Sequence, residues 1–134
     1  MEEKTRTAAD TYSPLTLAFV GDGVYDLLVR EHLVRQANRP VGELNRQKVA
    51  LVNCESQAHF AEILMPLLSE REQAVYRRGR NAAPKCTPKH GTVADYHSAT
   101  GLEALFGYLH LNGEQERIVE LFAIITKDRE LSHE

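Results

Sequence analysis

The sequence lacks the features that mark several classes of protein. It contains only two cysteines, Cys54 and Cys86, and no Cys-x-x-C pair, so neither a disulfide framework nor a redox motif is expected. No apolar run approaches the roughly 18 residues of a membrane span, and the polar start MEEKTRTAAD has no signal-peptide core. These absences predict a cytoplasmic protein with no membrane association.

Alternating runs of β-branched residues are also absent, whereas apolar residues recur at helical intervals, which predicts an all-α fold. The 134 residues, 43% of them hydrophobic and 26% charged, fit one domain with a single core. We expect residues 1–12 to form a flexible tail and residues 13–134 to form that domain. The expected helices run from Pro14 to about Ala37, from 43 to 68 with a division near Cys54, from Ser69 to near Gly79, from Thr92 to Leu111 and from Glu114 to about Lys127.

Acids outnumber basic residues by 19 to 16, which gives the chain a formal net charge of −3. The exception is the segment from Gln73 to Ala94, which has five Lys or Arg residues and no acid, leaving −8 for the rest of the chain. Its second half, GRNAAPKCTPKHGT, contains prolines and glycines and is expected to be a loop. A solvated basic loop and a phosphate-binding segment both fit this pattern. The five cations are Arg77, Arg78, Arg80, Lys85 and Lys89.

Two apolar segments each place an acid close to two glycines. In LAFVGDGVYDLLVREHL, Asp22 lies between Gly21 and Gly23, at the edge of an expected apolar helix face. Each glycine inside a helix costs about 1 kcal/mol relative to alanine, so their presence there needs a reason. That face comprises Leu17, Val20, Val24, Leu27 and Leu28.

In the second segment, SATGLEALFGYLHL, Glu103 lies among apolar residues and is flanked by Gly101 and Gly107. Two carboxylates brought together repel each other unless a proton or a cation lies between them. Mg²⁺ suits such a pair because it binds one or two carboxylates and keeps several waters. On spacing alone, each acid could instead pair with a nearby arginine or face the solvent. The expected apolar face comprises Leu102, Leu105, Phe106 and Leu109.

Together the two segments resemble the catalytic helices of the ribonuclease III family. The first resembles the family signature, an apolar helix carrying Gly-Asp and then a small residue, and LEALFGYLHL resembles the second catalytic helix. The closest resemblance is to the short subgroup called Mini-ribonuclease III. It extends from about Leu15 to Leu111 and includes RRGRNA at Arg77–Ala82 and TPK at Thr87–Lys89.

The resemblance implies a ribonuclease III-type endonuclease domain that forms a helical homodimer, with Asp22 and Glu103 as the catalytic, metal-binding acids. It implies Mg²⁺ as the cofactor, with Mn²⁺ as an expected substitute, and cleavage of double-stranded RNA. For the Mini subgroup, it also implies maturation of the ends of 23S ribosomal RNA precursor, with ribosomal proteins as further candidate partners. Because the chain ends one helix after the second segment, no double-stranded-RNA-binding domain is expected, and RNA contacts are assigned to the five cations named above.

Two supporting acids of full-length ribonuclease III have no counterpart here, because Ala18 and Thr100 occupy their positions. We therefore expect weak metal binding, with waters or the Thr100 hydroxyl in the vacated ligand positions. Asp26 is expected to pair with Arg30, one helical turn further on, rather than to bind metal.

Two other functions stay open, namely a catalytically inactive helical dimer that binds structured RNA and a helical protein-interaction module. Retention of both acids argues against the first, and the acid-free basic segment argues against the second. A zinc site built from Cys54, His59, Cys86 and His90 is not expected, since their spacing matches no usual zinc motif.

Overall fold

The computed structural model describes residues 8–84 and 91–132 of the chain. These residues form helices and 3-10 turns without a strand among them, so the all-α prediction is confirmed. The boundary between two helices close to Cys54 is confirmed as well. The elements are η1 (Ala8–Thr11), α1 (Pro14–Gln36), α2 (Val41–Val52), α3 (Cys54–Leu64), η2 (Met65–Leu67), α4 (Glu70–Ala82), α5 (Val93–Leu111) and α6 (Gln115–Ser132).

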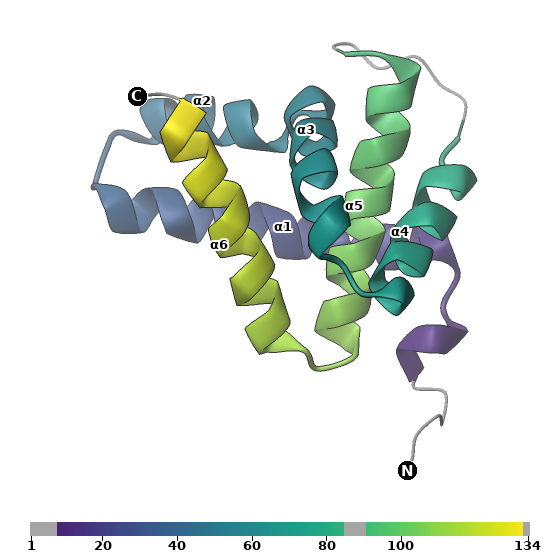
Figure 1. The fold of residues 1–134 in the computed structure, drawn as a ribbon. Coiled ribbons are helices and arrows are strands. Elements are labelled where there is room, and N and C mark those ends of the chain that lie inside the picture. Colours follow the sequence, from purple (N-terminus) through teal and green to yellow (C-terminus); the bar gives the residue numbers. More distant parts are fainter. Residues whose placement is uncertain (1–7, 85–90, 133–134) are drawn as a thin grey trace.

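Helix α5 lies at the centre of the domain, in contact with α1, α3, α4 and α6 (Figure 1). From Ala99 to Leu109, Glu103 is the one residue that is not buried. Since neighbours cover α5 on several sides, most of its circumference must be apolar, which explains its sequence.

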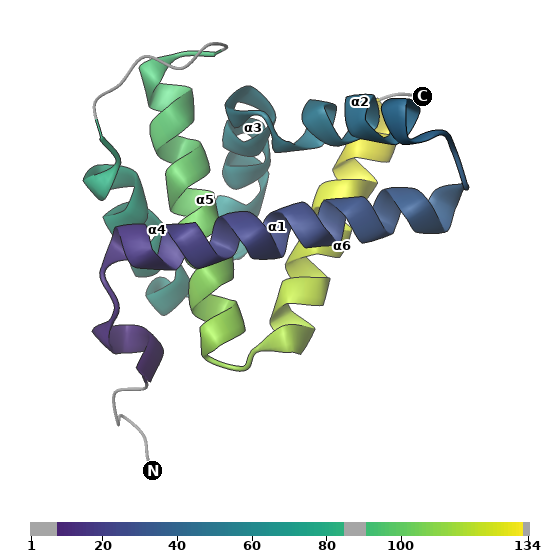
Figure 2. The ribbon, with the colours of Figure 1, turned by 180° about the vertical axis from the view of Figure 1, so that it is seen from behind.

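Helix α1 runs across α5, as the opposite view shows (Figure 2). The two backbones touch at a pair of glycines. A Cβ added to Gly21 would lie 1.6 Å from the carbonyl oxygen of Glu103, and one added to Gly107 would lie 1.9 Å from that of Leu17. Only glycine permits an approach this close.

The predicted apolar face of α1 was wrong in part. The buried face of α1 follows Leu17, Gly21, Tyr25, Val29 and Leu33, at intervals of four residues. Leu27, which was expected to be buried, is 56% exposed. The small Gly21 sits at the centre of the packed face, and a hydrophobicity pattern does not count glycine as a core residue.

Side-chain caps define the starts of three helices. The Ser13 side chain accepts from the backbone N–H of Thr16 at the start of α1, and capping boxes open α4 at Ser69 and α5 at Thr92. Three helix ends differ from the prediction, because α3 ends at Leu64 and is followed by η2, whereas α4 continues to Ala82 and α6 to Ser132. Arg80 is therefore helical rather than part of the following loop.

The segment before α1 contains a turn that was not predicted. Ala8–Thr11 forms η1, in which Ala9 is fully buried, and the Tyr108 hydroxyl donates to Asp10 Oδ1 at 3.0 Å. Residues 1–7 of the expected tail lie outside the described residues.

None of the helices, over the residues the structure describes, is both long and apolar enough to cross a membrane.

Candidate functional site

The crossing of α1 and α5 brings Asp22 and Glu103 together. Asp22 follows the buried Gly21, and the missing side chain of Gly21 lets α1 rest on the backbone of Glu103. The two carboxyl groups lie within hydrogen-bonding range of each other, with Asp22 exposed and Glu103 more enclosed. The structure thus joins two acids that are far apart in the sequence.

The surroundings of Glu103 favour its neutral form in the absence of a cation. Burial, followed by the negative charge of Asp22 and a hydrogen bond with it, raises the pKa of Glu103 to about 7. A hydrogen bond from Gln57 acts in the opposite direction. A carboxyl with this pKa marks a place where a positive charge would be strongly stabilising.

The donor set fits a hard divalent cation. Carboxylate oxygens are the protein ligands that Mg²⁺ prefers, and it commonly binds through one or two of them while retaining waters. Across residues 8–84 and 91–132, His, Cys, Asp and Glu form no group of three or more that could hold a metal. Asp22 and Glu103 would therefore hold the ion with water in its other positions.

The two positions that lack the supporting acids are both buried. Ala18 and Thr100 are each 6% exposed, and the Thr100 hydroxyl donates to the carbonyl oxygen of Tyr96 at 2.9 Å. The hydroxyl hydrogen is thus bonded within α5 rather than toward the acids.

Gln57 is the residue of this site that sequence reasoning missed. It lies on α3 and is 2% exposed, and its Nε2 donates to Glu103 Oε2 at 3.4 Å. A clue exists, because Gln57 shares helical spacing with the buried Phe60, Ala61 and Leu64. A polar side chain on such a face is expected to have a buried partner, although the sequence does not say which one.

Asp26 is excluded from the acid pair by its partners. Arg30 Nε lies 2.6 Å from Asp26 Oδ2, which confirms the predicted helix pair, and Lys48 Nζ lies 3.5 Å from Oδ1. Of the four residues weighed for a zinc site, Cys86 and His90 lie outside the described residues.

The described cations of the basic segment lie on the last turns of α4. Arg77 donates to Gln73 Oε1 at 3.1 Å, Arg78 is exposed, and the Arg80 guanidinium lies 5.7 Å from the centre of the Tyr76 ring. The helix therefore presents these side chains on a rigid element. Lys85 and Lys89 lie outside the described residues.

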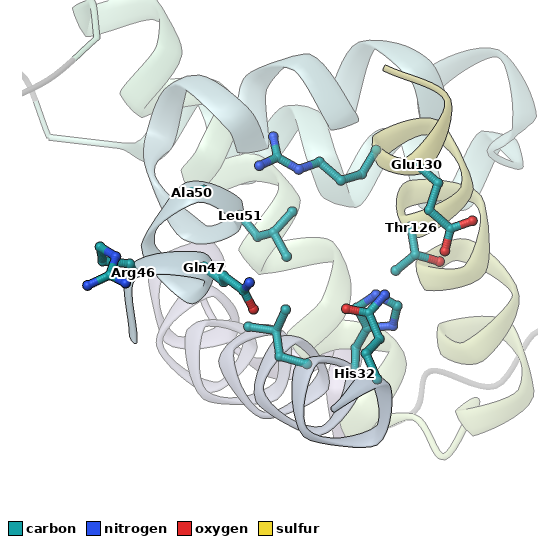
Figure 3. A pocket seen from close by; sticks show the side chains of 10 residues that line it. His32, Arg46, Gln47, Ala50, Leu51, Thr126 and Glu130 are labelled. Atoms are coloured by element: carbon teal, nitrogen blue, oxygen red, sulfur yellow. The ribbon is translucent and has the colours of Figure 1, made fainter. Parts of the chain in front are cut away.

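A cavity of about 460 Å³ lies elsewhere, between the second half of α1, α2 and α6 (Figure 3). His32 and Gln47 point into it, whereas Arg46 points away. His32 follows Asp22 by ten residues, or about 15 Å along a helix, so this cavity is separate from the acid pair.

Comparisons with known proteins agree with this architecture. The family model for the Ribonuclease III domain matches residues 15–114 of the sequence. The Mini-ribonuclease 3 of Thermoanaerobacter sp. (strain X514) is 43% identical over 120 residues, covering 90% of this chain and 84% of the relative. That of Symbiobacterium thermophilum is 45% identical over 111 residues, covering 83% and 85% respectively. The crystal structure of protein FN1578 from Fusobacterium nucleatum superposes with a TM-score of 0.81 at 31% identity, covering 87% of this chain and 95% of that one.

An all-helical domain in which two crossing helices each contribute an acid, with these matches, defines an endoribonuclease of the ribonuclease III type. The chain belongs to the Ribonuclease III domain family and, within it, to the Mini-ribonuclease III group. The family resemblance that was predicted from the two motifs is confirmed, and double-stranded RNA is the substrate class that this domain implies.

Proposed function

We propose that this endoribonuclease cleaves double-stranded RNA in a Mg²⁺-dependent reaction in which Asp22 and Glu103 hold the ion. The observation that carries the proposal is the pairing of these two carboxyl groups across the α1–α5 crossing, next to solvent at Asp22. The bound ion supplies a water of lowered pKa and a Lewis acid for the phosphate. Glu103 must lose its proton to take part, and its raised pKa places that step close to neutral pH.

Cleavage of both strands calls for a second copy of the site, and α1 offers a surface for a homodimer. Leu15, Phe19 and Leu27 are 42%, 83% and 56% exposed, and they follow one another at multiples of four residues along one helix face. An exposed aromatic side chain within an apolar stripe is typical of a protein interface. A twofold dimer built on this face would present two acid pairs to the two antiparallel strands.

The RNA backbone would be held by the five cations of the basic segment, of which Arg77, Arg78 and Arg80 extend from α4. A-form RNA is recognised mainly by shape and by phosphate and 2′-hydroxyl contacts, so this grip would work with little base specificity. By similarity to the Mini-ribonuclease III group, the substrate would be 23S ribosomal RNA precursor, processed at its ends in the cytoplasm, with Mn²⁺ able to replace Mg²⁺. Ribosomal proteins would be the further partners.

The proposal is tested by incubating the protein with long double-stranded RNA, first with Mg²⁺ and then with EDTA. We expect shortened duplex products with Mg²⁺ and intact RNA with EDTA. A gel shift in EDTA distinguishes the two other functions. An inactive RNA-binding dimer would shift the duplex, whereas a protein-interaction module would not. Cleavage that proceeds equally in EDTA would contradict the proposal.

A further inference from the structure

Gln57 connects the acid pair to the end of a helix that does not contribute an acid. Its Nε2 donates to the Val52 carbonyl oxygen at 2.8 Å and to Glu103 Oε2 at 3.4 Å. Because the Val52 bond orients the amide, its nitrogen rather than its oxygen faces the Glu103 carboxylate.

The Val52 carbonyl belongs to the last turn of α2, where helix geometry leaves four carbonyl groups without helical N–H partners. Side chains bond to three of them, those of Ala50, Leu51 and Val52, and the fourth, that of Asn53, accepts the backbone N–H of Gln57. Asn53 Nδ2 donates to Val49 and Ala50, and Ser56 Oγ also donates to Ala50. The Tyr25 hydroxyl donates to Leu51 at 3.0 Å, and Gln57 donates to Val52. This anchored turn gives the Gln57 amide a fixed support.

The amide oxygen of Gln57 makes this side chain less favourable for stability than an apolar side chain of similar length. Oε1 is buried and has no hydrogen-bond partner. A buried polar atom without a partner is unfavourable, and an apolar side chain of similar length would avoid it. The amide nitrogen, by contrast, meets a carboxylate, and hydrogen bonds to charged groups are stronger than those between neutral groups.

We propose that Gln57 is a positioning residue for the metal-binding carboxylate, holding Glu103 in the orientation in which it faces Asp22. The inference rests on the proposed function, in which Glu103 binds the cation. Partners of this kind, which bond to a metal ligand rather than to the metal, commonly change metal affinity by about 10–100-fold when they are removed.

The test measures Mn²⁺ binding to the RNA-free protein from the electron paramagnetic resonance signal of the free ion. Gln57→Met keeps the length of the side chain and removes the amide. We expect its Mn²⁺ dissociation constant to be roughly 10-fold or more above that of wild type. Its half-saturating Mg²⁺ concentration for RNA cleavage should rise by a similar factor, whereas the rate at saturating Mg²⁺ should stay within a few-fold of wild type. Gln57→Leu serves as a second variant if Gln57→Met does not fold.

Tyr25→Phe is the matched control. It removes a buried hydrogen bond to the neighbouring carbonyl at the same helix end, and the ring can keep its contacts with Phe106 and Phe122. A general loosening of α2 would weaken Mn²⁺ binding in both variants, whereas positioning of Glu103 predicts a loss with Gln57→Met alone.

The outcomes distinguish the role of Gln57 from the metal site itself. Wild-type Mn²⁺ affinity in folded Gln57→Met, or an equal loss in Tyr25→Phe, overturns the role of Gln57. Glu103→Gln, measured in the same titration, tests the site itself. If Glu103→Gln binds Mn²⁺ as wild type does, the proposed metal site fails, whereas loss in Glu103→Gln without loss in Gln57→Met refutes only the positioning role.

Discussion

Gly21 of α1 rests directly on the backbone of Glu103 in α5, so that a Cβ at position 21 would lie 1.6 Å from the Glu103 carbonyl oxygen. One contact therefore sets both the distance between the helices and the position of Asp22, the next residue along α1, relative to Glu103. Fold and site depend on the same glycine.

Gly21→Ala should consequently disrupt both. Because the obstacle is backbone rather than a flexible side chain, we expect a loss of about 3 kcal/mol or more in the free energy of unfolding. Gly23→Ala is the matched control, since a Cβ there meets nothing within 4 Å. That change should raise stability by up to about 1 kcal/mol, because alanine favours the helix. Urea unfolding of the two variants measures the difference, and equal stabilities would contradict the packing explanation.

The stability of the metal-free protein should depend on pH through Glu103. Its pKa is raised from 4.5 to about 7 in the folded protein, so the folded state binds more protons between these values and stability falls as pH rises. With about 1.4 kcal/mol per pKa unit, we expect a loss of about 1–3 kcal/mol between pH 4.5 and 7. Glu103→Gln should remove this part of the pH dependence. Urea unfolding of wild type and variant at pH 5 and 8 tests this prediction. An identical change in unfolding free energy between the two pH values in both proteins would refute it.

The same pKa determines how metal binding responds to pH. Since Mg²⁺ binds the ionised carboxylate, the Mg²⁺ concentration for half-maximal cleavage should fall as pH rises through 7. A half-maximal concentration that stays constant from pH 6 to 8 would show that Glu103 is already ionised in the free enzyme.

Removal of two cations from α4 should weaken RNA binding for every duplex sequence. In Arg78→Ala/Arg80→Ala we expect the slope of log affinity against log salt concentration to become shallower by about one or two units. A protein that contacts fewer phosphates releases fewer counterions when it binds RNA. Arg80 also lies over the Tyr76 ring, so a circular dichroism melt of each single variant must accompany the binding curves. Arg129→Ala, on α6 beside the separate cavity, is the control. A folded double variant with the wild-type salt slope would rule out this grip.

The dimer surface on α1 can be tested at Phe19, which is 83% exposed. We expect wild type to scatter light as a particle of about twice the 15.1 kDa chain mass, and Phe19→Ser to shift toward the single-chain mass. Val119→Ser is the control, because Val119 is an exposed apolar residue on a different helix, at 62%. A dimer that survives Phe19→Ser but not Val119→Ser would place the interface on α6 instead.

Sequence reasoning located the helices and the two acids because both depend on local patterns. Ser69 and Thr92 are capping residues that lie next to the helices they begin, and Asp22 and Glu103 stand in short motifs. The role of Gly21 could not be predicted in the same way, since its partner is the backbone of a helix far along the chain. For this reason the predicted buried face of α1 included Leu27, which is exposed in the structure.

Gln57 escaped prediction for the same physical reason. Its partner Glu103 is 46 positions away, and the contact exists only once α3 and α5 pack together. The sequence places a polar residue on an apolar helix face, but its partner depends on how the helices meet. The extension of α4 to Ala82, beyond the expected end near Gly79, follows from Arg80, Asn81 and Ala82, which can continue a helix although a glycine precedes them.

The most direct test of the central claim measures cleavage of both strands of double-stranded RNA by Asp22→Asn, Glu103→Gln and Asp26→Asn, each in saturating Mg²⁺. Asp26 lies one turn from Asp22 on the same helix but is paired with Arg30 and Lys48, so it is a matched acidic control. We expect the first two variants to fold and bind RNA without cutting it, with metal-free stability equal to wild type or higher because one of two like charges is gone. Asp26→Asn should still cut. Retained cleavage in Asp22→Asn or Glu103→Gln would contradict the assignment of the site.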